Sequence, residues 1–97
     1  MTQKPPKDLS DEAKKLWRDI AETLDLDAGG AVMLTLLCEA HDRRAEARRA
    51  IAKDGAVSVD RFGQSKASPW TAIERDSGLA IQRAYHALGM DLIQGGE

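Results

Sequence analysis

The side chains best suited to nucleophilic or metal chemistry are one cysteine and two histidines. Cys38 and His41 form a C-x-x-H spacing, and His86 lies much further along the chain. Three such side chains could ligate a metal ion, and a cysteine beside a histidine could serve as nucleophile and base. Because zinc sites usually contain clearer ligand pairs, we interpret Cys38 as a small buried thiol and His41 as a partly exposed imidazole. We expect no metal ion and no cofactor.

Motifs for catalysis are missing from the sequence. It contains no glycine-rich phosphate-binding motif, no nucleophile elbow and no paired-histidine motif. It also shows no convincing helix-turn-helix pattern. Residues on one helix face above a thin core do not form a substrate pocket, so an enzyme is the least favoured of the function classes that we consider, and we expect none.

Basic side chains are the other candidates for function, because they can contact DNA phosphates. The chain has 14 basic and 16 acidic residues, for a net charge of −2. Any contact with nucleic acid must therefore come from a local patch. The candidates cluster in the middle of the chain, and they are Arg43, Arg44, Arg48, Arg49, Lys53, Arg61 and Lys66.

Two of these arginines have an alternative role. Arg44 and Arg48 fall on or beside an apolar seam, and a buried arginine needs a partner. A bridge to Glu74 or Asp76 is the simpler interpretation. The alternative is an interface between subunits, or a wall that faces DNA.

The element that must position most of these residues is a long helix over 31–53. This stretch contains no glycine and no proline, and Gly55 beyond it is a natural stop. Its length is about 35 Å at the standard helical rise. Its first half is almost entirely apolar, so it must be covered on more than one side.

Two further helices and a hairpin complete the predicted fold. Ser10 is a good N-cap for a helix over 11–24, and Asp27 can cap the long helix. Ser68-Pro69 starts a third helix over 69–88, which Gly89 ends. Alternating valines predict a short β-hairpin or extended loop over 56–67. A two-stranded hairpin is not stable alone, so its apolar residues must pack on helices or on a neighbour.

The predicted fold class is therefore mainly α, with one domain. We expect a flexible leader over 1–8, a single helical oligomerising domain over 9–92 and a loose C-terminus over 93–97. With only four aromatic residues the core is thin, and another subunit often completes such a core. The candidate interface residues are Met33, Leu37, Ala40, Phe62 and Trp70.

Nothing in the composition indicates export or a membrane. A single cysteine cannot form an internal disulfide bond, and no apolar run approaches the length of a membrane span. The expected location is the cytoplasm, with no membrane partner.

Three stretches, taken in order, resemble the small subunits of phage terminases. LSDEAKKLWRDIAETLDLD (9–27) resembles their opening, with a leucine–serine–acid start, a tryptophan and an acidic turn. GAVSVDRFGQSKASPW (55–70) resembles a later signature, in which a strand leads to a turn glycine, a basic residue and a helix-starting proline. HALGMDL (86–92) is similar to their close.

The resemblance implies a DNA-packaging role in the host-cell cytoplasm. Such proteins are nonenzymatic partners of a large terminase subunit, which holds the ATPase and the nuclease. They bind double-stranded viral DNA, commonly assemble as homo-oligomeric rings, and also occur in prophages and gene transfer agents. The alternative that we keep is a small helical interaction module or regulator without a packaging role.

Overall fold

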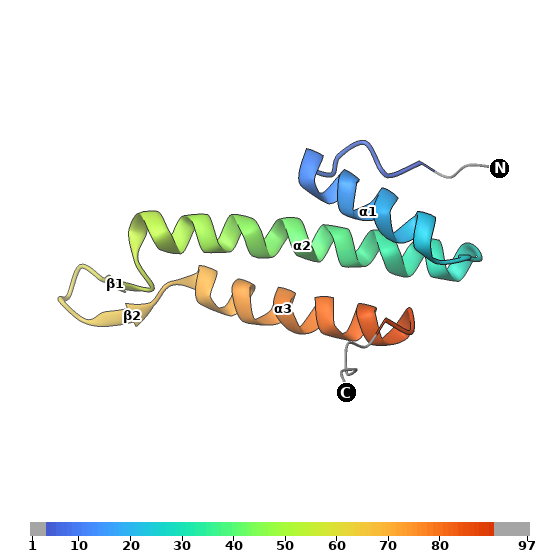
Figure 1. Cartoon of the computed structure of the whole chain (residues 1–97). Helices are drawn as coiled ribbons and strands as arrows, with labels where there is room; N and C mark the ends of the chain where they lie inside the picture. Colours follow the sequence, from blue (N-terminus) through green and yellow to red (C-terminus); the bar gives the residue numbers. More distant parts are fainter. Residues whose placement is uncertain (1–3, 91–97) are drawn as a thin grey trace, which may run out of the picture.

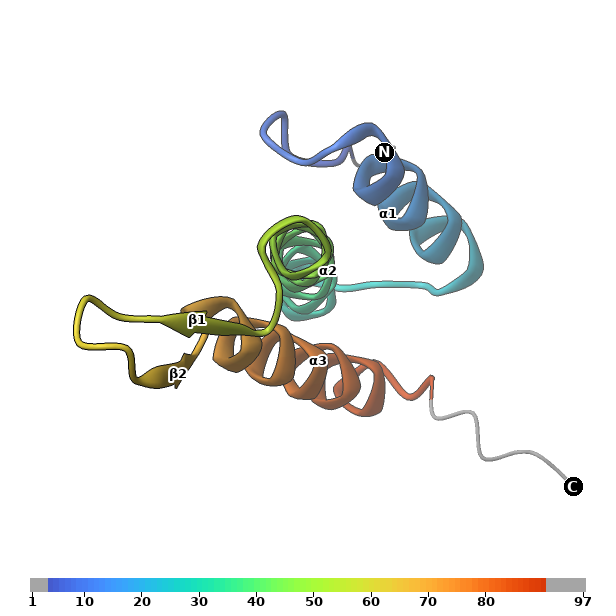
Figure 2. The same cartoon turned by 90° about the vertical axis from the view of Figure 1, so that its left-hand side faces the viewer.

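The computed structural model describes residues 4–90 and contains three helices and a two-stranded sheet. The elements are α1 (Asp11–Thr23), α2 (Ala28–Asp54), β1 (Val57–Val59), β2 (Ser65–Ala67) and α3 (Pro69–Ala87). Helix α2 is central, and α1 and α3 pack on different sides of it (Figures 1 and 2). The predicted mainly α class is confirmed. The prediction of a loose C-terminus over 93–97 lies outside the described residues.

Helix α2 begins at Ala28, earlier than the predicted start at Ala31. The Asp27 side chain accepts a hydrogen bond from the Gly30 N–H at 2.7 Å, which caps the new first turn. Leu26 folds over this turn, and a Cβ at position 30 would lie only 2.9 Å from Leu26 Cδ2. The cap and this close approach explain why the two glycines lie inside the helix despite their low helix propensity.

The hydrophobic core lies between α1, the first half of α2 and the end of α3. The buried face of α1 contains Ala13, Trp17 and Ile20, which recur at helical spacing. Leu34 and Leu37 of α2 are fully buried beneath them. The indole Nε1–H of Trp17 donates to the Thr35 hydroxyl at 3.3 Å, so the largest side chain of the core has a polar partner.

A second contact holds the start of α1 against α2. The carboxylate of Asp42 accepts hydrogen bonds from the Ser10 backbone N–H at 2.8 Å and from the Ser10 hydroxyl at 2.5 Å. The same hydroxyl oxygen accepts from the Ala13 N–H at 3.0 Å, as an N-cap does. One carboxylate therefore fixes both the cap of α1 and its position on α2.

Replacing Asp42 with alanine should loosen this end of α1. We expect a loss of about 1 to 2 kcal/mol in the free energy of unfolding, because two hydrogen bonds to a charged acceptor disappear. Urea denaturation followed by tryptophan fluorescence measures the loss. Glu46→Ala, an exposed change on the same helix, is the matched control, and an equal loss in both variants would contradict the proposed contact.

Small residues allow α2 and α3 to lie close together. Ala47, Ser77 and Ala84 are buried where the two helices meet. The Ser77 hydroxyl donates to the Ile73 carbonyl at 2.5 Å and contacts the Glu74 carbonyl at 3.2 Å, both within α3. The buried hydroxyl is thus satisfied inside its own helix.

The hairpin projects past the ends of the helices (Figures 1 and 2). Its strands are antiparallel, with Val57 opposite Ala67 and Val59 opposite Ser65. Every residue of both strands is exposed, and so is Phe62 in the turn. Within residues 4–90 the helices therefore do not supply the cover that these apolar side chains need.

Candidate nucleic-acid interface

The basic residues gather at one end of the molecule. Residues 43–67 contain seven basic and three acidic side chains, whereas the whole chain has 14 basic and 16 acidic. They belong to the second half of α2 and to the hairpin, the end that extends beyond α1 in Figure 1. A chain with a net negative charge thus has a distinctly positive end.

The basic side chains of α2 do not share a single face. Residues four apart lie on the same side of a helix, whereas adjacent residues point about 100° apart. Arg49 and Lys53 therefore share one side, and Arg44 and Arg48 share another, toward α3. The structure brings the predicted DNA-contacting residues to one end but distributes them around it.

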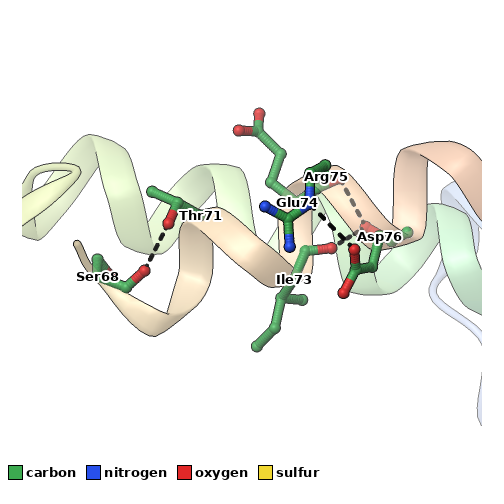
Figure 3. Close-up of polar contacts among 7 residues, drawn as sticks. Ser68, Thr71, Ile73, Glu74, Arg75 and Asp76 are labelled. Carbon is green, nitrogen blue, oxygen red and sulfur yellow. Dashed lines mark hydrogen bonds and ion pairs between the residues drawn. The ribbon is translucent and has the colours of Figure 1, made fainter.

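Arg48 makes the bridge to α3. Its Nε lies 3.7 Å from a Glu74 carboxylate oxygen. Arg44 lies against Gly78 instead, where its Nε is 3.6 Å from the place that a Cβ would occupy. Asp76 pairs with Arg75 of its own helix at 3.2 Å (Figure 3). The interpretation of a bridge to Glu74 thus holds for Arg48.

The remaining basic residues differ in the groups that lie next to them. Lys66 lies 3.8 Å from the carboxylate of Asp60, and the Arg61 guanidinium lies 5.0 Å from the centre of the Phe62 ring. Among the described residues, no acid lies within ion-pair distance of three exposed cations on α2, namely Arg43, Arg49 and Lys53. These three are the side chains most available to a phosphate.

The predicted interface residues fall into different environments. Leu37 and Ala40 are buried inside the core of this chain. Met33 packs against the same core, and Trp70 is partly buried at the start of α3. Phe62 is 73% exposed. In this conformation, Phe62 is therefore the most accessible member of the set.

A second group of cations, beside the N-terminal segment, has a mixed charge. Lys4, Lys7, Lys14 and Arg18 line a hollow of about 680 Å³ along α1, together with Glu22 and other residues. The N-terminal lysines approach α1 only in the folded chain, so sequence spacing did not indicate this hollow. Glu22 and Asp25 lie among these cations in the lining of the hollow.

Cys38 and His41 do not form a catalytic pair. Cys38 is fully buried, and His41 Nδ1 is buried without a hydrogen-bond partner among the described residues. Burial, with smaller contributions from the Asp42 and Glu39 carboxylates, raises the pKa of the Cys38 thiol to about 11. A reactive cysteine needs a lowered pKa, so this thiol is a core residue. No group of three potential metal ligands occurs within residues 4–90.

Cys38 should be protected in the folded protein. At pH 8 we expect slow alkylation of the native chain and rapid alkylation after unfolding, measured by mass spectrometry. Because the folded state holds this proton to about pH 11 and the ordinary thiol pKa is 9.0, folding stability should fall as the pH rises through that window. The Cys38→Ala variant should not show this part of the loss of stability at high pH. Rapid alkylation of Cys38 in the folded wild-type chain would contradict its buried position.

Three helices, a projecting hairpin and a basic end define a small, mainly helical protein. The family model described as "Phage terminase, small subunit" matches residues 13–94. The chain therefore belongs to the phage terminase small subunit family, as the resemblance indicated. No curated protein and no solved structure matches this chain. None of the described helices combines the length and hydropathy that a membrane span requires.

Proposed function

We propose that this terminase small subunit binds double-stranded DNA through its basic end and brings it to the large terminase subunit for packaging. The family assignment supports a role in phage DNA packaging. We place the DNA site at this end because residues 43–67 are positively charged and α1 does not cover α2 there. Phosphate contacts from these cations need no sequence-specific motif.

The working form that we propose is a homo-oligomeric ring in the cytoplasm of the host cell. The basic end of a single copy offers only a few exposed cations without an ion pair, so its affinity for DNA would be modest. Several copies joined in a ring act together on one duplex, and their phosphate contacts reinforce one another. The proposed element of origin is a phage, a prophage or a gene transfer agent. The large subunit supplies the catalytic steps in this scheme.

Removing two of the cations tests the DNA site. Arg48→Ala combined with Arg49→Ala should lower DNA retention in a low-salt gel shift severalfold, because two potential phosphate contacts per copy disappear. The control combines Arg18→Ala with Arg83→Ala, which removes the same charge from exposed positions outside residues 43–67. Unchanged retention in the first variant, or an equal loss in the control, would place the DNA site elsewhere.

A further inference from the structure

The hairpin has one apolar face and one polar face. Side chains alternate along a strand, so Val57 and Val59 point to the same side, and their partners across the ladder are Ala67 and Ser65. Ser58 and Lys66, which are paired with each other, point to the opposite side. The valines are 57% and 68% exposed. A single face of this projecting ribbon thus lacks cover.

The tip of the hairpin is ordered by its own hydrogen bonds. Asp60 Oδ1 accepts from the backbone N–H groups of Phe62 and Gln64, each at 2.9 Å. The Arg61 guanidinium lies over the Phe62 ring, 5.0 Å from the ring centre. An aromatic side chain and a cation are therefore presented together, and ordering them before contact lowers the entropy that binding must overcome.

A complementary groove lies on the first half of α2. Val32 and Leu36 are one turn apart and are 60% and 50% exposed. They line a hollow of about 640 Å³ with Ala31, Thr35 and Glu39, and Trp17, Lys4 and Pro6 also border it. Its lining is mainly apolar, with one carboxylate and one ammonium group. Such a lining suits an apolar segment, and Glu39 offers a partner for a cation beside that segment.

The hairpin of the same chain cannot reach this groove. From Leu36 to the end of α2 the helix alone extends for about 27 Å. The hairpin then continues away from α1, beyond the end of the helix (Figure 1). The hairpin and the groove on α2 therefore lie toward different ends of a molecule that is 57 Å long.

We propose that the hairpin of one copy docks in the α2 groove of a second copy. The apolar face of the hairpin, with Phe62, covers Val32 and Leu36, and Arg61 approaches Glu39. The apolar side chains of both surfaces stay exposed among the described residues, and Arg61 and Glu39 have opposite charges. This inference rests on the homo-oligomer of the proposed function and assigns its contact surfaces.

The arrangement also keeps the basic end available to DNA. Docking uses the valine face of the hairpin, so Lys66 on the opposite face stays in solvent. The contact joins two different surfaces, so it is directional, and repetition of the same contact closes a ring when the rotation between copies permits. One hairpin thus joins neighbouring subunits and leaves a cation on their outer side.

Placing one negative charge in either surface tests whether that surface takes part in the docking. Phe62→Asp alters the hairpin and Leu36→Glu alters the groove, both at exposed positions, and melting temperatures verify that each variant is folded. Each variant should sediment as a monomer at concentrations where the wild-type chain assembles. Leu79→Glu on α3, an apolar residue that is 42% exposed, is the control and should keep the wild-type mass. Wild-type mass in either test variant, or a monomeric wild-type chain, would overturn the proposal.

Mixing the two variants gives a sharper result. The Phe62→Asp chain retains an intact groove, and the Leu36→Glu chain retains an intact hairpin. Together they can form one contact only, so we expect a heterodimer and no larger particle. A mixture that remains monomeric would overturn the pairing, because it would show that these two surfaces are not each other's partners.

A covalent test does not depend on weakening the assembly. A chain with both Leu36→Cys and Phe62→Cys should form intermolecular disulfide bonds on mild oxidation, seen as a ladder on a denaturing gel. A control chain with Leu79→Cys and Phe62→Cys should form at least about tenfold less of the disulfide-linked product. No ladder from the first chain, or equal ladders from both, would overturn the docking.

The outcomes separate this inference from the proposed function. If the wild-type chain forms a particle that retains DNA and the variants assemble normally, the docking is wrong and the proposed function stands. If the variants and the ladder behave as expected but the wild-type particle retains no DNA in low salt, the docking stands and the DNA role fails. A wild-type mass of two chains would keep the docking as a reciprocal pair and exclude the ring.

Discussion

Replacing Trp17 with alanine is expected to cost about 3 to 5 kcal/mol in the free energy of unfolding. Trp17 is 3% exposed and is the largest side chain of a thin core, between α1 and α2. Its removal leaves a cavity that the small neighbouring residues cannot fill, and it eliminates the hydrogen bond to Thr35. Domains of this size have a total stability of about 5 to 15 kcal/mol, so a large share of it disappears.

Trp70 provides the control for this experiment. It is the only other tryptophan of the chain, and it is partly buried at the start of α3. Trp70→Ala should cost less, because less of its surface is removed from water, and it leaves Trp17 as the single tryptophan fluorophore. Chemical denaturation followed by circular dichroism compares both variants by the same signal. A Trp17→Ala effect below about 1 kcal/mol would show that α1 does not depend on this side chain.

The sequence predicted the helices well because their ends carry strong local signals. Ser10 caps α1, and Ser68 caps α3 ahead of Pro69, as expected from residue type alone. Gly55 and Gly89 follow the last turns with positive φ angles of 87° and 74°, which glycine adopts at little cost. Such signals act within a few residues, so they do not require knowledge of the tertiary fold.

Contacts between distant residues account for what the sequence did not show. Asp42 falls among other charged residues of α2, and nothing in its spacing indicates that it binds Ser10, which lies 32 residues earlier. The early start of α2 depends on Leu26 packing over Gly30. The exposure of Val32 and Leu36 depends on the path of α1, because an apolar helix half can be covered on several sides.

The candidate site was predictable in its location but not in its pairings. A run of arginines in one stretch indicates a positive end wherever the helix lies. The choice of Arg48 rather than Arg44 as the partner of Glu74 depends on how α3 is positioned against α2. For the same reason, the burial of Leu37 and Ala40 in the core could not be separated from burial in a subunit interface by periodicity alone.

Reversing the unpaired cations of α2 should have the largest effect on DNA. A triple variant with Arg43→Glu, Arg49→Glu and Lys53→Glu changes the formal net charge of the chain from −2 to −8. We expect DNA affinity in low salt to fall at least about a hundredfold, because favourable interactions with phosphates become repulsive in every copy of the assembly. The slope of log affinity against log salt should also become less steep, by about 0.9 for each phosphate that the variant no longer neutralises.

A variant of equal charge separates a specific surface from general repulsion. Arg18→Glu, Arg75→Glu and Arg83→Glu also bring the net charge to −8, but at exposed positions outside residues 43–67. The two variants are therefore also compared at about 0.15 M salt, where affinity in this control should fall far less, since charges separated by more than about 8 to 10 Å are then largely screened. Melting temperatures verify that both variants are folded. If the affinities of the two triple variants fall equally, bulk charge governs DNA retention and the basic end is not its binding surface.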